Sequence, residues 1–178
     1  MDAARRREMF APAVVTVAGL VTIATAWGFE LIGGFIPCAL CLQERVPYYI
    51  GIPLAFAALL AALAGAKPTV VRMLLVIAGL IFAYGAFLGI YHAGAEWGWW
   101  LGPADCGGNA GGVANVDDLL SQLDTIRVVS CTEASWRLFG LSFAGWNAVA
   151  SIFLVAVAMW GAFRPLADEP AATAGSRA

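Results

Sequence analysis

Four long apolar runs constrain the fold of this chain more than any other feature. They cover residues 10–29, 46–64, 73–91 and 141–163, and no Lys, Arg, Asp or Glu occurs within them. Each run is close to the ~20 residues that an α-helix needs to cross the hydrocarbon core of a bilayer. Because a helix satisfies its own backbone hydrogen bonds, it is the expected structure in lipid. The sequence therefore predicts an all-α integral membrane protein, a bundle of four transmembrane helices.

Composition agrees with this class and limits the partners. The chain has 178 residues, of which 61% are hydrophobic and 12% charged, whereas a soluble domain of this length is much more polar. A net charge of −2 gives no basis for nucleic-acid binding, so the lipid bilayer is the expected environment. We predict a single membrane domain over residues 1–165, because no other segment is long enough for a second core. The polar tail, residues 166–178, is predicted to be disordered.

The distribution of basic residues predicts the orientation. Lys and Arg precede the first run, lie between the second and third, or follow the fourth: Arg5, Arg6, Arg7, Lys67, Arg72 and Arg164. Such residues favour the cytoplasmic side, so both termini are expected in the cytoplasm. The loops 30–45 and 92–140 then face outward, which in a bacterium is the periplasmic side. The small residues Ala24–Ala26 also suit a signal-peptide cleavage site, but the apolar stretch continues beyond them, which favours an uncleaved first helix.

All four cysteines, Cys38, Cys41, Cys106 and Cys131, fall in the two loops predicted to face outward. An oxidising compartment lets disulfides persist, and an even number makes two disulfides the simplest state. The sequence permits three pairings of four cysteines. Two structural bridges remain an alternative, and closure of the long loop between Cys106 and Cys131 suits that role well.

The spacing of Cys38 and Cys41 favours a redox role for this pair. A bridge across two intervening residues closes a very small loop and so constrains the unfolded chain little. Such a spacing is more typical of thiol–disulfide exchange. A zinc knuckle needs a second close pair, and a c-type haem needs His directly after Cys41, where Leu42 stands. We therefore expect no metal site.

Arg45 is a candidate to act on Cys41. We expect the second helix to begin just after Cys41, with Pro47 in its first turn. The helix amino terminus and the guanidinium would then favour a thiolate at Cys41. Glu44 is adjacent to Arg45, and neighbours on a helix do not face each other, so no pairing between them is assumed. Anchoring of Arg45 at the lipid headgroups is the alternative.

His92 is the only histidine and lies at the outer end of the third run. It can reach the same depth as Arg45, where a donor to an electron acceptor's developing oxygen charge would be useful. The surrounding aromatic residues also suit an ordinary membrane-interface belt, in which His92 has no special role. Further along, residues 115–126 predict a short amphipathic helix that lies on the bilayer or packs on the bundle.

These motifs resemble the disulfide bond formation protein B (DsbB) family of bacterial membrane proteins. The resemblance rests on CALCLQER at 38–45, YHAGAEWGWW at 91–100, the two loop cysteines and CTEASWRLFGLSFAGWN at 131–147. It implies a thiol:quinone oxidoreductase that reoxidises a DsbA-like periplasmic thiol oxidase and reduces ubiquinone or menaquinone. The acidic, Gly-rich segment between Cys106 and Cys131 departs from the family pattern and leaves the partner oxidase open.

The resemblance also implies individual roles. Cys106 would react with the reduced oxidase, Cys131 would resolve that step, Cys38 would exchange with the loop pair, and Cys41 would face the quinone. Arg45 would lie beside the quinone, and His92 falls where the family often has a residue affecting quinone use. The vitamin K epoxide reductase family runs a similar reaction, but its CxxC pair follows its loop pair, the reverse of the order here.

Overall fold

The computed structural model describes residues 3–102, 132 and 134–163. Within them lie four long helices, α1 (Ala3–Leu31), α2 (Ala39–Leu63), α3 (Pro68–Glu96) and α5 (Phe143–Phe163). Each is long and apolar enough to cross a membrane. The predicted fold class, a four-helix membrane protein, is confirmed.

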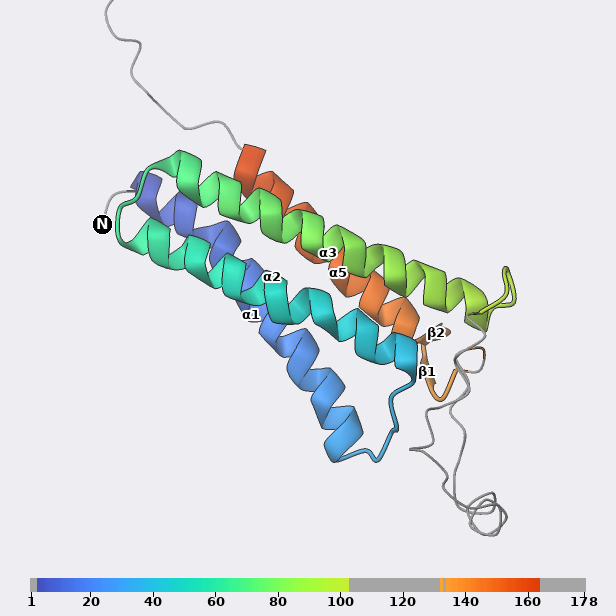
Figure 1. Cartoon of the computed structure of the whole chain (residues 1–178). Helices are drawn as coiled ribbons and strands as arrows, with labels where there is room; N and C mark the ends of the chain where they lie inside the picture. The colour runs from blue at the N-terminus through green and yellow to red at the C-terminus, as the bar shows by residue number, and fades with distance from the viewer. Residues whose placement is uncertain (1–2, 103–131, 133, 164–178) are drawn as a thin grey trace, which may run out of the picture.

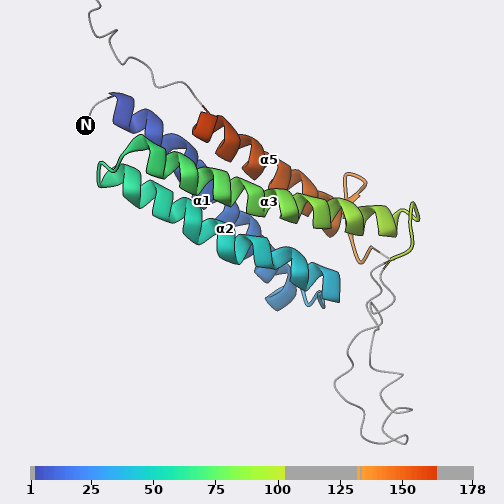
Figure 2. The same ribbon diagram turned by 45° about the horizontal axis from the view of Figure 1, so that its top comes forward.

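The helices form a bundle in which α3 packs on α2 and α5, and α1 packs on the same two helices. Figure 1 shows α1 diverging from α5 toward the end of the bundle where α1 and α3 finish and α2 and α5 begin, and Figure 2 shows the same end from another angle. We call this the cavity end. The opposite end, where residues 64–67 join α2 to α3, is called the packed end.

The packed end has a dense apolar core built largely from small residues. The fully buried members include Ala11, Ala58, Leu75, Ala158 and Ala162. Small side chains let helix backbones approach closely, which is how helices gain van der Waals contact in lipid. The packed end therefore provides a rigid base for the opposite end of the bundle.

The outer surface of the bundle is apolar as well. Large side chains such as Val17, Ile77 and Phe153 are exposed along the middle of their helices. An apolar surface of this extent is unfavourable in water but matches the hydrocarbon of a bilayer.

Helix boundaries differ from the apolar runs because helices continue past the last apolar residue. The third helix extends from Pro68 to Glu96 instead of over residues 73–91. It ends where Gly98 adopts a positive φ of 72° and Trp99 donates its backbone N–H to the Gly94 carbonyl at 2.9 Å. This is the usual glycine-based helix end. His92 and Glu96 therefore lie inside α3, one turn apart on the same face.

A short hairpin that sequence reasoning missed precedes the fourth helix. Strands β1 (Arg137–Leu138) and β2 (Leu141–Ser142) pair through a two-residue turn, Phe139–Gly140, in which both residues have positive φ. Such turns match the twist of paired strands. The helix predicted from residue 141 therefore begins at Phe143, and the Ser142 hydroxyl accepts a hydrogen bond from the Gly145 backbone N–H at 3.2 Å.

Candidate functional site

The second helix begins at Ala39, so the prediction that it starts after Cys41 with Pro47 in its first turn is wrong. Cys38 is the N-cap, and its Sγ accepts a hydrogen bond from the Cys41 backbone N–H at 3.2 Å. The helix can include Glu44 and Arg45 because both side chains have partners inside the protein. The uncharged run begins only at Val46, so it does not indicate that the helix starts at Ala39.

The contacts around the cysteine pair stabilise a thiolate on Cys38, whereas the sequence indicated a thiolate on Cys41. The Cys38 and Cys41 sulfur atoms lie 2.7 Å apart, and both thiols are free. The hydrogen bond from the Cys41 thiol lowers the pKa of Cys38 from 9.0 to about 4, helped by His92 and by the Cys41 backbone N–H and opposed by burial. Cys38 is therefore the thiolate of the reduced pair, and a thiolate is the form that exchanges disulfides.

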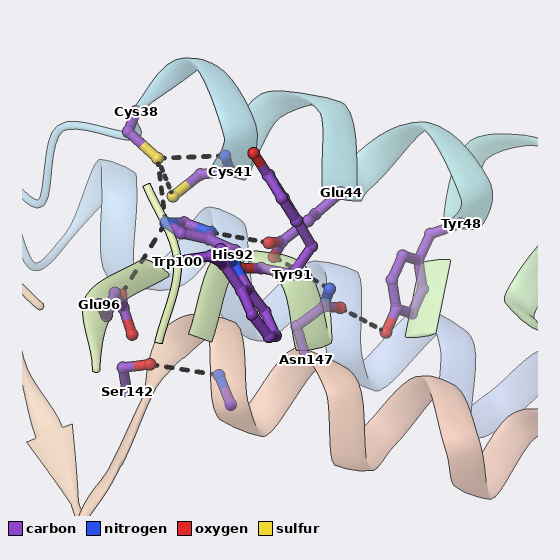
Figure 3. Close-up of polar contacts among 11 residues, drawn as sticks. Cys38, Cys41, Glu44, Tyr48, Tyr91, His92, Glu96, Trp100, Ser142 and Asn147 are labelled. Carbon is purple, nitrogen blue, oxygen red and sulfur yellow. Dashed lines mark hydrogen bonds and ion pairs between the residues drawn. The ribbon is translucent and has the colours of Figure 1, made fainter. Parts of the chain in front are cut away.

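His92 contacts the pair from α3. Its Nε2 lies 3.7 Å from the Cys38 Sγ, and its Nδ1 lies 2.7 Å from Glu44 Oε1 (Figure 3). The imidazole is only 3% exposed. His92 thus bridges a cysteine sulfur and a buried carboxylate, both of which belong to α2.

The network continues into the bundle through α5. Asn147 Nδ2 donates to the second Glu44 oxygen, Oε2, at 2.9 Å, and the Tyr48 hydroxyl donates to Asn147 Oδ1 at 2.8 Å (Figure 3). The same Tyr48 oxygen lies 3.0 Å from Ser151 Oγ. Buried polar groups need such partners, and a fully connected network fixes its members in place.

Sequence reasoning missed Asn147, Ser151 and the role of Tyr48. The available signal was two polar residues, four positions apart and so on one helix face, within the apolar run 141–163. Polar side chains inside a membrane helix generally face the protein interior and pair there. Asn147 and Ser151 therefore indicate a buried polar partner on another helix.

Arg45 points away from Glu44 and toward α1. Its Nη1 donates to Glu30 Oε2, and its guanidinium lies over the Trp27 ring at 5.2 Å from the ring centroid. Glu44 and Arg45 thus have different partners, His92 and Glu30, and no pairing between them had been assumed from the sequence. Glu30 was not anticipated as a partner, although it stands directly after the first apolar run, close in sequence to the cysteines.

A cavity of about 520 Å³ lies between α1, α2 and α5, next to these groups. Cys38, Cys41, Arg45 and His92 all line it, so the structure brings together the four predicted site residues that it describes. Most of the remaining wall is apolar, and the walls include four aromatic rings in mutual contact: Phe29, Phe35, Trp136 and Phe143. A cavity of this size and lining suits a flat, largely apolar small molecule held by a few polar groups.

Two cysteines and a histidine lie close enough together to be considered as metal ligands. In the described part of the chain, Cys38, Cys41 and His92 present ligand atoms within 4.8 Å of one another. The spacing of the cysteines alone does not predict the histidine from α3. Tetrahedral Zn–S bonds of about 2.3 Å hold two sulfur atoms about 3.8 Å apart. Because the Cys38 and Cys41 sulfur atoms lie 2.7 Å apart, their arrangement in this structure does not fit a zinc ion.

Several predicted features lie outside the described residues. They are Cys106, Cys131, the amphipathic helix at 115–126 and the tail at 166–178. The pairing of the loop cysteines therefore stays a prediction.

Taken together, fold and site define a multi-pass membrane protein with a CxxC pair at the edge of a cavity between its helices. The chain matches the family described as "Disulfide bond formation protein DsbB" over residues 7–161. It is 30% identical over 171 residues to "Disulfide bond formation protein B 2" of Pseudomonas savastanoi pv. phaseolicola (strain 1448A / Race 6), covering 92% of this chain and 91% of that protein. It is 27% identical over 172 residues to "Disulfide bond formation protein B" of Stutzerimonas stutzeri (strain A1501), covering 92% and 99%.

No solved structure matches the chain. The family match and the two relatives cover most of the sequence, and the chain belongs to the DsbB family. It is therefore a membrane oxidoreductase of disulfide bond formation.

Proposed function

We propose that this protein is a thiol:quinone oxidoreductase that reoxidises a DsbA-like periplasmic thiol oxidase. Two thiols and one quinone become one disulfide and one hydroquinone, and the acceptor is ubiquinone or menaquinone from the membrane pool. The observation that carries the proposal is that the Cys38–Cys41 pair opens onto a largely apolar cavity of about 520 Å³ that also contains Arg45. A structural disulfide needs no such cavity.

The cavity suits a quinone on chemical grounds. Its aromatic walls offer faces on which a planar ring can stack. Cys41 lines it directly, which places a sulfur atom where the electrons must leave the protein. The quinone supplies the two-electron acceptor, and the protein supplies position and charge.

Arg45 is the residue best placed to stabilise the reduced acceptor. A guanidinium carries five N–H donors, and the Glu30 contact uses Nη1. The remaining donors can serve an oxygen that gains negative charge in the cavity. The ring of Trp27 and the carboxylate of Glu30 hold the guanidinium in place from α1.

The first half of the electron route runs through the long loop. Cys106 takes electrons from the reduced oxidase, Cys131 resolves the mixed disulfide, and the loop pair then reduces Cys38–Cys41. This order rests on the family resemblance and on the N-cap position of Cys38, whose thiolate is a good leaving group in the exchange.

The redox cysteines must face the periplasm for this route, with both termini in the cytoplasm. A topology reporter fused after Lys67 should behave as cytoplasmic, and one fused at Gly111 as periplasmic. The reverse pattern would place all four cysteines in a reducing compartment, where the proposed cycle cannot run.

The decisive assay is quinone reduction by the purified full-length protein, with a reduced DsbA-like oxidase as donor. We expect one hydroquinone for each disulfide formed in the oxidase. A Cys131→Ser variant should trap a mixed disulfide with the oxidase through Cys106, visible as a larger band that reductant removes. Absence of both the adduct and quinone reduction would support structural disulfides instead.

A further inference from the structure

A chain of buried hydrogen bonds leads away from Cys38 through residues that also line the cavity. It runs from Cys38 to His92, on to Glu44 and Asn147, and reaches Tyr48, which also contacts Ser151. Three helices, α2, α3 and α5, contribute its members (Figure 3). His92 and Glu44 are almost fully buried, with side-chain exposures of 3% and 7%.

From this geometry, and resting on the thiol:quinone function proposed above, we infer that His92 accepts the proton of the Cys38 thiol, and that Glu44 and Asn147 are positioning residues for His92. The three groups form a nucleophile, a base and an orienting carboxylate in hydrogen-bonded sequence. That arrangement activates nucleophiles in many unrelated enzymes. In this arrangement His92 acts on the Cys38 thiol and not on an oxygen of the acceptor.

The two ring nitrogens of His92 have different roles. Nδ1 lies 2.7 Å from Glu44 Oε1, so it carries a proton and donates it to the carboxylate. Nε2 is then the basic atom, and it lies 3.7 Å from the Cys38 Sγ, within reach of a thiol proton. Transfer of that proton gives a Cys38 thiolate and a His92 imidazolium, whose charge the Glu44 carboxylate balances.

The rest of the chain fixes Glu44. Its second oxygen accepts the Asn147 amide, and Asn147 is held in turn by the Tyr48 hydroxyl. A carboxylate held at both oxygens cannot rotate away from the imidazole. The arrangement thus keeps one tautomer and one ring orientation, which is what a proton acceptor needs.

The two protons that the cysteines release equal the two that the quinone takes up. Loss of the Cys38 proton to His92 moves no electrons. When the Cys38 thiolate bonds to Cys41 sulfur, two electrons pass to the quinone, and two protons are required to complete the hydroquinone. The Cys41 thiol supplies one proton and the His92 imidazolium supplies the other, so His92 returns to its neutral form and no net proton is taken from solution.

Other groups around His92 also influence its charge and must be considered in a pH experiment. From α2 these are Cys38, Cys41 and Glu44. From α3 it is Glu96, whose Oε1 lies 3.9 Å from Nε2, and Arg137 of β1 acts on Glu96 in turn. Asn147 of α5 is neutral, and from α1 the nearest charge is Glu30, which lines the same cavity but pairs with Arg45.

The test is a thiolate titration of the reduced protein without quinone or oxidase. A protein carrying Cys106→Ser and Cys131→Ser retains only the Cys38–Cys41 pair. Ultraviolet thiolate absorbance is followed against pH, and alkylation with mass spectrometry assigns the thiolate to a residue. Before further substitution, the Cys38 thiolate should persist down to about pH 4. Because the acceptor is absent, a negative result leaves the quinone assay, and thus the proposed function, unaffected.

The direction in which Glu44→Gln shifts the Cys38 ionisation midpoint distinguishes two roles for Glu44. If Glu44 orients and balances the imidazolium, Glu44→Gln should raise the midpoint of Cys38 ionisation by about one pH unit or more. If Glu44 were only a nearby negative charge, its removal would favour the thiolate and lower the midpoint. Glu44→Asp should restore part of the loss. The matched control Glu30→Gln removes a carboxylate from the same cavity without touching His92, and should leave the Cys38 titration unchanged.

A second variant keeps the test open if Glu44→Gln does not fold, as judged by size-exclusion chromatography. His92→Gln retains polarity but cannot hold a proton, so it should also raise the Cys38 midpoint by about one unit or more. A midpoint that falls or stays constant in Glu44→Gln, or that stays constant in His92→Gln, overturns the relay.

Discussion

The two ends of the bundle use the same four helices in opposite ways. At the packed end, small residues such as Ala58 and Ala158 are completely buried in an apolar cluster to which all four helices contribute. At the cavity end, α1 diverges, a cavity of about 520 Å³ remains, and the interior holds Glu44 and His92. Dense packing at one end permits an open, polar arrangement at the other, because helices anchored at one end keep the cavity residues in register.

The two ends are also stabilised by different kinds of interaction. Close packing stabilises the packed end through many weak contacts, none of which is individually essential. The cavity end instead depends on a few connected hydrogen bonds, where loss of one partner leaves a buried charge without its counterpart. Substitutions at the packed end should therefore change stability, and substitutions at the cavity end should change chemistry.

The largest effect on chemistry is expected for Cys41→Ser. The serine hydroxyl cannot form a disulfide with Cys38, so quinone reduction should fall by at least ~1000-fold while the helices remain intact. Turnover with reduced oxidase and circular dichroism of the same sample measure the two quantities. Substantial residual turnover would show that electrons leave the protein without passing through this pair.

Leu75→Ala should produce the converse result at the packed end. Leu75 is 1% exposed, and its truncation leaves a cavity that should lower the free energy of unfolding by about 2–5 kcal/mol. Unfolding in mixed detergent micelles measures this change. The turnover number of the folded fraction should stay the same, and a proportionate loss of turnover would mean that the two ends are not separable.

Arg45→Gln tests whether the guanidinium at the cavity end acts on the quinone. Loss of the guanidinium should lower kcat/KM for quinone about 10-fold to 100-fold, with Cys38–Cys41 pairing preserved. Arg45→Lys should recover part of the activity, since it keeps the charge but not the planar fork. Kinetics with oxidase and quinone varied separately measure the effect. A change confined to the oxidase dependence would place Arg45 on the docking surface for the oxidase.

The smallest effect is expected for Glu30→Gln. The variant loses the ion pair that holds Arg45 from α1, which is partly exposed and should contribute only about 0.2–1 kcal/mol. The KM for quinone should rise up to about fivefold, with little change in kcat. An effect as large as that of Arg45→Gln would mean that Glu30 itself acts on the acceptor.

The sequence was sufficient for the parts of this structure that depend on composition. Four uncharged runs predicted four membrane helices, and the spacing of Cys38 and Cys41 indicated exchange chemistry. The helix boundaries were less accessible, because α2 begins at Ala39 only if Glu44 and Arg45 find partners inside the protein. Those partners, His92, Asn147 and Glu30, lie on other helices, and the sequence around Glu44 and Arg45 does not identify them.

The same limit applies to the role of His92. Its position at the end of the third run placed it at the right depth, near Arg45. Its actual neighbours are Cys38 and Glu44, and that choice depends on how α3 is rotated against α2. Rotation is set by packing at the interface, such as the close approach of Gly85 in α3 to Pro47 in α2, which is visible only in three dimensions.

The central claim is that the Cys38–Cys41 dithiol itself passes electrons to a quinone. It is tested most directly by mixing the reduced Cys106→Ser, Cys131→Ser protein with one equivalent of quinone in the absence of oxygen and oxidase. The account predicts one Cys38–Cys41 disulfide and one hydroquinone per protein. A dithiol that persists beside unreacted quinone, or hydroquinone formed without that disulfide, would contradict it.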